Sequence, residues 1–483
     1  MTQHLTLGTF VEALTNWHPD SLEMPVYPII DSRLARPGAL FFALPGEHVD
    51  GHDYVEDALA RGAAAAVVQR DVVVATEVAV LSVSDDLQPT LLLGRPLLIK
   101  VPDVLKAMQE VARWWRQRLG VRVIAVTGSV GKTTTKEVVA QVLSRNYKVS
   151  WSKGSFNNEI GLPLTLLELT DASERLVVEM GMYVRGDIRF LADIARPDVG
   201  IVTNVEPVHA ERAGNLDEIA LGKRELPESL PSLPNGVAIL NYDDPRVRDM
   251  AAHTQARILL YGLSPEADLW ADEVKGLGLG GLRATLHYGD DAVMVTVPLL
   301  GRHSIYAVLR GAAAGLVEGL SWDEIVAGLQ GLEDPLRLQI VQGTDDVVII
   351  DDTYNSSPPS ALAALDLLTD LDGRKLAALG DMLELGEYER DGHIQVGCRA
   401  AEVVAELVVV GELAAMIGEG AVRCGLSATR VHAAADSDAA VEVVSSLLQP
   451  GDVILVKGSR GVKMERIVDA LKAGVADDEA VEG

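Results

Sequence analysis

A short glycine-containing loop between an apolar run and a helical pattern constrains the fold of this chain more than any other feature. Residues 121–128, VRVIAVTG, form an apolar run typical of a buried strand, and SVGKTTTKE follows directly at 129–137. A G-K-T triplet after a strand and before a helix aims backbone N–H groups at bound phosphate. The usual pattern, G-x-x-x-x-G-K-[ST], would place a glycine where this chain has Val126. The segment therefore predicts a shortened phosphate-binding loop in an α/β domain.

The length of 483 residues and the spacing of the apolar runs predict an α/β protein of three domains. We expect a small N-terminal α/β domain over 1–100 and a central P-loop-type domain with a doubly wound parallel sheet over 101–332. A helix over 101–119 is expected to bridge them. The strand–helix alternation restarts over 333–475, which predicts a C-terminal Rossmann-like α/β domain, and 476–483 reads as a disordered tail. Strand-like segments lie at 176–180, 199–204, 236–241, 347–352, 376–382, 407–412 and 452–459.

Composition and charge exclude several classes of protein. With 48% hydrophobic residues and a formal net charge of −28, the chain fits a protein with large cores and does not fit a nucleic-acid binder, since such binders neutralise phosphates with Lys and Arg. No Lys or Arg precedes Arg33, and no apolar run reaches about 18 residues, so we expect a cytoplasmic protein without membrane insertion. Cys398 and Cys424 lie in Ala-rich surroundings without C-x-x-C spacing, so we expect two buried thiols rather than a disulfide.

The loop and the strand ends that follow it offer candidate ligands for phosphate and metal. Lys132 would reach the nucleotide phosphates and the Thr133 hydroxyl would bind Mg²⁺. Glu179 closes the strand LVVEM, where a P-loop sheet commonly offers a carboxylate to the metal; a solvated glutamate at a strand end is the alternative. His209 follows another strand, although a lone histidine is more often structural than a ligand. By pattern alone, Lys223 is a surface lysine on a helix.

Taken together, these segments resemble the Mur ligase family, whose members form amide bonds in peptidoglycan precursors at the expense of ATP. Family members carry a shortened loop, T-G-x-x-G-K-T-[TS], which TGSVGKTT at 127–134 matches. The segments GSFNNEIGLPLTLL (154–167), DDTYNSSPPS (351–360), LGDMLELGE (379–387) and VKGSRGVKME (456–465) extend the resemblance over nearly the whole chain. It implies ATP with two Mg²⁺ ions, UDP-N-acetylmuramoyl-tripeptide and D-alanyl-D-alanine as substrates, and an acyl phosphate intermediate. We expect a monomer, although the sequence leaves the oligomeric state open.

The resemblance also implies roles for individual residues. Lys132, His209 and Lys223 would be catalytic, with Lys223 carbamylated because a carbamate offers Mg²⁺ the anionic oxygen ligands that it prefers. Thr133 and Glu179 would hold one metal ion, and His209 and Lys223 the other. The implied nucleotide contacts are Thr127, Gly128, Ser129, Val130, Gly131, Lys132, Thr133, Thr134, Arg337 and Asp352. The implied substrate contacts are Ser32, Arg33, Gly46, Glu47, Asn157, Asn158, Tyr354, Asn355 and Pro358.

The chain departs from the family pattern near the end of the central domain. Where relatives read G-x-H-N-x-x-N-x-x-A-A, this chain reads GRHSIYAVLRGAA at 301–313, so Ser304 and Ala307 replace two asparagines, the second of them near adenine. We expect weaker nucleotide selectivity in an active enzyme, because one lost hydrogen bond is worth about 0.5–1.5 kcal/mol. Glu206 stands where relatives often have glycine.

Three alternatives stay open at this point. The first is a folylpolyglutamate-synthase-like or other Mur-type ligase with a different amino acceptor. The second is a catalytically silent relative, and the third is an unrelated P-loop kinase. The sequence also leaves open whether the third residue of the peptide is diaminopimelate or lysine, and whether D-Ala-D-lactate is accepted.

Overall fold

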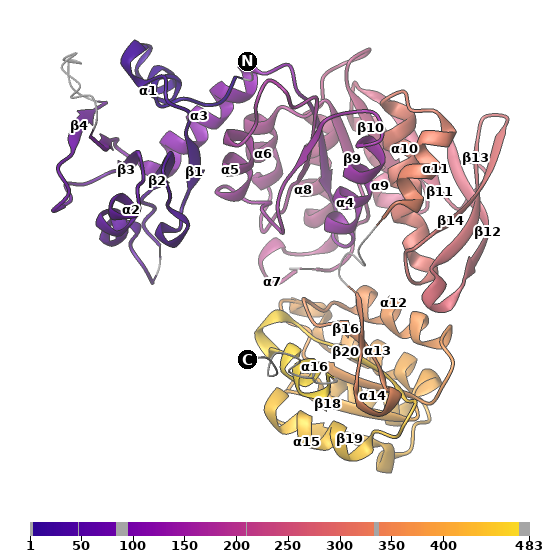
Figure 1. Cartoon of the computed structure of the whole chain (residues 1–483). Coiled ribbons are helices and arrows are strands. Elements are labelled where there is room, and N and C mark those ends of the chain that lie inside the picture. Colours follow the sequence, from indigo (N-terminus) through magenta and orange to yellow (C-terminus); the bar gives the residue numbers. More distant parts are fainter. Residues whose placement is uncertain (1–2, 47, 84–94, 209, 333–337, 473–483) are drawn as a thin grey trace, which may run out of the picture.

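The computed structural model describes residues 3–46, 48–83, 95–208, 210–332 and 338–472, whose strands form three sheets that follow one another along the chain (Figure 1). The sheets have five, nine and six strands. Each is accompanied by helices from its own stretch of the chain, since strands that are apolar on both faces must be covered on both. This arrangement confirms the predicted α/β class and the three-part organisation.

The first sheet is parallel throughout. Its strands are β1 (Tyr27–Ile29), β2 (Ala39–Phe42), β3 (Ala65–Val68), β4 (Ala79–Ser82) and β5 (Leu97–Lys100). They are ordered β1-β2-β3-β5-β4, and the central strands β2 and β3 are buried along their whole length. The accompanying helices are α1 (Leu7–Thr15) and α2 (Val55–Ala60).

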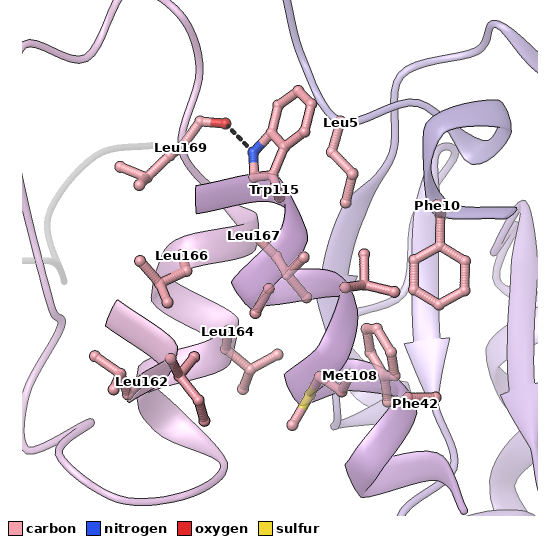
Figure 2. Packing of buried hydrophobic residues seen from close by; sticks show 14 of the residues in the cluster. Leu5, Phe10, Phe42, Met108, Trp115, Leu162, Leu164, Leu166, Leu167 and Leu169 are labelled. Atoms are coloured by element: carbon pink, nitrogen blue, oxygen red, sulfur yellow. Dashed lines mark hydrogen bonds between the residues drawn. The ribbon is translucent and has the colours of Figure 1, made fainter. Parts of the chain in front are cut away.

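Helix α3 (Val104–Arg118) joins the first sheet to the second, as predicted. Figure 2 shows its apolar face between Phe10 of α1 on one side and the leucines of α5 (Gly161–Leu167) on the other. Trp115 is fully buried in this cluster, and its indole N–H donates to the carbonyl oxygen of Leu169 at 3.0 Å. One continuous core therefore ties the first unit of the fold to the second.

The second sheet contains the phosphate-binding loop. Its strands are β6 (Arg122–Thr127), β7 (Val149–Trp151), β8 (Arg175–Glu179), β9 (Val199–Val202), β10 (Val237–Asn241), β11 (Arg257–Gly262), β12 (Leu269–Gly276), β13 (Leu282–Tyr288) and β14 (Asp291–Val297). Its helices besides α5 are α4 (Lys132–Leu143), α6 (Asp187–Ala195), α7 (Ala210–Ala213), α8 (Leu216–Glu228), α9 (Pro245–Asp249), α10 (Ile305–Val317) and α11 (Trp322–Gln330).

The order of this sheet places β6 at its topological switch point. The strands run β14-β13-β12-β11-β10-β9-β6-β8-β7, parallel from β7 to β12 and antiparallel across β12, β13 and β14. The chain goes from β6 to β7 and β8 on one side and returns to β9 on the other. In open α/β sheets, ligands bind outside the carboxyl ends of the strands at such a reversal. The predicted parallel strands β8, β9 and β10 are confirmed, whereas the antiparallel strands were not predicted.

The third sheet repeats the parallel arrangement. Its strands are β15 (Gln339–Gln342), β16 (Val348–Asp352), β17 (Lys375–Gly380), β18 (Glu406–Val410), β19 (Val431–Ala434) and β20 (Val453–Lys457). They are ordered β15-β16-β20-β17-β18-β19, with only β15 antiparallel to its neighbour. The helices are α12 (Pro358–Thr369), α13 (Glu389–Val403), α14 (Ala415–Arg423), α15 (Ser437–Leu447) and α16 (Glu465–Leu471).

The expectation of two separate thiols was wrong. Cys398 and Cys424 form a disulfide with a Cα–Cα distance of 5.0 Å, although 26 positions separate them. The pairing follows from the close approach of α13 and α14: a Cβ on Gly397 would lie 2.0 Å from the carbonyl oxygen of Ile417. The spacing of the cysteines carries no trace of this tertiary contact, so the sequence argument missed it.

The prediction for the tail at 476–483 falls outside the described residues. Within the ranges that the structure does describe, no helix combines the length and the apolarity needed to cross a membrane.

Candidate active site

The phosphate-binding loop lies between the end of β6 and the start of α4, as predicted. Gly128 has a φ of 142°, and a Cβ at this position would lie 1.8 Å from the hydroxyl oxygen of Thr203. Gly131 has a φ of 83° and is the N-cap of α4, which no side chain caps. Both positions therefore need glycine. The N-terminus of α4, with its orphan N–H groups and positive helix end, faces the loop and makes it an anion site.

The segment that follows β9 holds this loop in place. The backbone carbonyl of Asn204 accepts a hydrogen bond from the N–H of Ser129 at 3.0 Å, and its side-chain oxygen accepts one from the N–H of Val130 at 2.9 Å. The Thr203 hydroxyl donates to the carbonyl oxygen of Val130 at 2.7 Å. The Ser129 hydroxyl donates to the carbonyl oxygen of Glu206 and accepts from its N–H, both at 2.8 Å. Glu206 thus anchors the loop through its backbone.

Thr133 and Glu179 meet beside the loop, as predicted for a pair of metal ligands. The Thr133 hydroxyl donates to Oε2 of Glu179 at 2.8 Å, and the side-chain amide of Asn157 donates to Oε1 at 2.9 Å. Thr133 and Glu179 are both buried. The ammonium group of Lys132 bends back over the loop and donates to two of its carbonyl oxygens at 2.9 and 3.1 Å.

This pair has the chemistry of a magnesium site. A hydroxyl and a carboxylate are the hard oxygen ligands that Mg²⁺ prefers. In the described part of the chain, no cluster of three or more His, Cys, Asp or Glu side chains could bind a metal ion. A Mg²⁺ ion at Thr133 and Glu179 would therefore take its other ligands from phosphate and water, as Mg²⁺ usually does in nucleotide sites.

Lys223 lies on α8 and is buried, with a relative exposure of 4%. The prediction from pattern alone, a surface lysine, is therefore wrong: the helix turns this residue inward. Burial, and secondly the nearby ammonium group of Lys132, hold the pKa of Lys223 well below its ordinary value. The side chain makes no hydrogen bond or ion pair with any described residue. The enclosed amine of Lys223 therefore holds its proton less tightly than the amine of a surface lysine does.

A cavity of about 540 Å³ opens next to the loop and reaches from α3 to α8. Its size is that of a pocket for a small molecule. It brings together the loop, the asparagine pair at 157–158 and Lys223, all of them predicted site residues. The polar residues that line it are Asp103, Lys106, Gln109, Ser129, Lys132, Asn157, Asn158, Glu159, Tyr183, Asp187 and Lys223.

The third sheet contributes a second group of predicted residues at the carboxyl end of β16. Oδ2 of Asp352 accepts from the ammonium group of Lys457 at 2.6 Å, and the same ammonium group donates to the carbonyl oxygen of Asn355 at 2.8 Å. The hydroxyl groups of Tyr354 and Ser155 are hydrogen-bonded at 2.7 Å, which links this unit to the loop before α5.

Comparison with known proteins identifies the family. Three family models match: Mur ligase family, catalytic domain, at 29–116; Mur ligase middle domain, at 126–315; and Mur ligase, glutamate ligase domain, at 336–460. The chain is 37% identical over 479 aligned residues to the UDP-N-acetylmuramoyl-tripeptide–D-alanyl-D-alanine ligase of Mycobacterium tuberculosis, covering 93% of this chain and 92% of that protein. The chain belongs to the Mur ligase family.

Solved structures agree with this assignment. The crystal structure of MurF from Acinetobacter baumannii is 28% identical, with a TM-score of 0.82 over 98% of this chain and 99% of that one. MurF ligase from Thermotoga maritima, solved in complex with ADP, is 27% identical, with a TM-score of 0.76 over 92% of this chain and 97% of that one. Membership of the family excludes the unrelated P-loop kinase that the sequence left open.

Several residues predicted for this Mur ligase do not line the cavity. Ser32 is buried at the start of a short turn, and Arg33 is exposed and paired with Asp31 at 2.7 Å. Gly46 forms a tight turn in which its N–H donates to the carbonyl oxygen of Val49 at 3.0 Å. The predictions for Glu47, His209 and Arg337 lie outside the described residues.

Sequence reasoning missed two contributions to the Mur ligase site. Asp103, the N-cap of α3, and Lys106 and Gln109 within α3 line the cavity, although we predicted this helix only as a bridge. The signal was present, because these positions are the polar ones at the start of an amphipathic helix. Asn204 supports the loop from the end of β9, and its polarity directly after an apolar run was the available clue.

Proposed function

We propose that this chain is an ATP-dependent ligase that joins D-alanyl-D-alanine to UDP-N-acetylmuramoyl-tripeptide and so forms the pentapeptide precursor of peptidoglycan. The observation that carries the proposal is the similarity to ligases of this name over more than nine-tenths of the chain. The phosphate-binding loop and the adjoining cavity are suitable binding sites for ATP and for the substrate that ATP activates.

The reaction that suits this site proceeds through an acyl phosphate. A carboxylate oxygen of the tripeptide attacks the γ-phosphorus of ATP, and the bond to the β–γ bridging oxygen breaks to release ADP. The amine of D-alanyl-D-alanine then attacks the acyl carbon, phosphate leaves, and the amine loses its proton. Two anions meet in the first step, so Lys132 and the N-terminus of α4 are the groups that offset their repulsion. Backbone N–H groups of residues 131–134, at the start of α4, would orient the phosphates.

Metal binding completes this proposal. Thr133 and Glu179 would hold one Mg²⁺ ion, and a carbamylated Lys223 with His209 a second. Bound Mg²⁺ would supply charge neutralisation and alignment of the phosphate oxygens. The burial of Lys223 and the lowered pKa of its amine support carbamylation, because only the neutral form of an amine reacts with carbon dioxide.

We assign the substrates to the three domains as follows. Residues 1–100 would bind the UDP-sugar end through Ser32, Arg33, Gly46 and Glu47, and residues 101–332 would bind ATP and, through Asn157 and Asn158, the peptide. Residues 333–475 would bring in the dipeptide and close over the nucleotide, which excludes water from the acyl phosphate. The residues proposed for that closure are Arg337, Asp352, Tyr354, Asn355 and Pro358.

Phosphate release from ATP, measured with each component omitted in turn, tests the proposal. We expect release only when Mg²⁺, UDP-N-acetylmuramoyl-tripeptide and D-alanyl-D-alanine are all present, with a product heavier than the tripeptide substrate by one dipeptide residue. Turnover with a single amino acid in place of the dipeptide would instead favour a ligase with another acceptor. Binding of ATP without any turnover would favour a silent relative.

A further inference from the structure

Arg310 places a guanidinium group against the phosphate-binding loop. It lies on α10, which packs on α4, and its relative exposure is 6%. A Cβ on Gly131 would lie 3.2 Å from Nη2 of Arg310. The cation is therefore in contact with the glycine that precedes Lys132.

Among the described residues, the interactions of this guanidinium group are with Tyr261, whose ring centroid lies 5.8 Å from the guanidinium carbon. Nη1 donates to the hydroxyl oxygen of Tyr261 at 3.3 Å, and Nε is buried without a hydrogen bond. Within the described part of the chain, no carboxylate lies within ion-pair distance of Arg310. Buried charges are normally paired, because an unpaired one costs several kcal/mol of solvation.

The acidic residues after β10 are engaged elsewhere. Oδ2 of Asp243 accepts from the hydroxyl of Tyr306 at 2.9 Å and from the N–H of Leu263 at 2.7 Å. Asp244 caps α9 and accepts from the N–H of Val205 at 2.7 Å. Neither Asp243 nor Asp244 forms an ion pair with Arg310. The segment after β10 therefore does not supply a counter-charge for the guanidinium group.

We propose that Arg310 is, besides Lys132, a second cationic side chain that binds the phosphates of the nucleotide. Its counter-charge would be an oxygen of the α- or β-phosphate of ATP. A guanidinium group suits this task because its parallel N–H donors match two phosphate oxygens. Lys132 donates to two carbonyl oxygens of the loop, and Arg310 lies against Gly131. Since ADP keeps both phosphates, Arg310 acts on nucleotide binding more than on the chemical step. This inference rests on the proposed use of ATP.

Calorimetric titration of the full-length protein with ADP and Mg²⁺ tests the proposal. We expect Arg310→Ala to raise the Kd for ADP roughly 10- to 100-fold, as for the loss of hydrogen bonds to a charged group. Arg310→Gln should bind ADP as weakly as the alanine variant, because glutamine can still reach Tyr261 but carries no charge. Arg310→Lys should recover part of the affinity. Arg283→Ala, which removes an exposed arginine on β13, should leave the Kd unchanged.

The stability of the nucleotide-free protein separates this role from a structural one. Removal of an unpaired buried charge should leave the Tm of Arg310→Ala equal to or above that of the wild type, with the KM for UDP-N-acetylmuramoyl-tripeptide unchanged. A lower Tm together with full recovery of ADP affinity in Arg310→Gln would show a structural brace and overturn the proposal. Unchanged ADP binding in Arg310→Ala would overturn it as well. A wild-type protein that binds no ADP would contradict the proposed function itself.

Discussion

At the scale of single residues, burial decides the chemistry of Lys223. A lysine on the surface is an ammonium ion near neutral pH, whereas Lys223 is enclosed and lies near the charge of Lys132, which lowers its pKa. A residue that the sequence pattern places on the surface is therefore buried beside the phosphate loop, in a setting that lowers its pKa.

The first prediction concerns this amine. We expect Lys223→Ala to lower kcat roughly 100-fold or more, because it would remove the proposed metal ligand from a site that neutralises phosphate charge. NMR of the wild type with isotopically labelled bicarbonate should show a carbamate resonance that Lys223→Ala lacks. Lys148→Ala, at an exposed position, is the control and should keep full activity. Wild-type turnover in Lys223→Ala would contradict the metal arrangement.

The second prediction concerns Glu206 and pH. Burial, and secondly the charge of Asp244, raise the pKa of Glu206 above its ordinary value. The folded state therefore binds this proton more tightly than the unfolded state, so the ionised carboxylate destabilises the fold near neutral pH and the penalty disappears as pH falls through the folded pKa. Glu206→Gln should unfold at higher urea concentration than the wild type near neutral pH. At a pH of about 4, the ordinary pKa of glutamate, the difference between the urea midpoints of the variant and the wild type should shrink. If the two midpoints differ equally at both pH values, this explanation is wrong.

At the scale of secondary-structure elements, a buried ion cluster fastens the end of α10 to the second sheet. Glu318 follows α10 and is 7% exposed as a whole residue. Its two carboxylate oxygens accept from Nε of Arg122 on β6 at 2.7 Å and from Nε of Arg175 on β8 at 2.6 Å. The helix that carries Arg310 is thus tied to the strand that leads into the phosphate loop.

The third prediction tests this cluster. Glu318→Ala leaves two partly buried arginines without their carboxylate, and breaking a buried pair in this way costs about 3–5 kcal/mol. Urea unfolding followed by circular dichroism should show a loss of this size, whereas Asp290→Ala at an exposed turn should show almost none. A loss below about 1 kcal/mol, the range of surface pairs, would mean that the cluster is not a structural tie.

Some of the secondary-structure elements could be predicted from the sequence, and others could not. Continuous apolar runs predicted the parallel strands β6, β8 and β9, because strands covered on both faces need them, and the G-K-T triplet predicted where α4 begins. The strands β12 to β14 alternate buried and exposed positions, a weaker signal that we did not interpret. Contacts between segments that are distant in the chain could not be predicted, because no local sequence pattern indicates them. The disulfide of Cys398, the support of Ser129 by Glu206 and the placement of Arg310 all depend on tertiary packing.

At the scale of the whole molecule, residues of the candidate site lie where α/β units of the chain adjoin one another. The cavity runs from α3, which shares a core with the first sheet, to the phosphate loop and α8. The hydrogen bond between Tyr354 and Ser155 joins the third unit to the loop before α5. Such a site can bring a carboxylate, ATP and an amine together while elements of different units exclude water from the reactive intermediate.

The central claim is that the reaction proceeds through an acyl phosphate. Transfer of labelled oxygen from the substrate to phosphate tests this claim most directly. The carboxylate oxygens of UDP-N-acetylmuramoyl-tripeptide would be labelled with a heavy isotope, and the phosphate released in the presence of ATP, Mg²⁺ and D-alanyl-D-alanine would be analysed by mass spectrometry. An acyl phosphate requires each released phosphate to carry one labelled oxygen, because the carboxylate oxygen that attacked the γ-phosphorus leaves with it. Release of unlabelled phosphate, or of labelled AMP with pyrophosphate, would contradict the account.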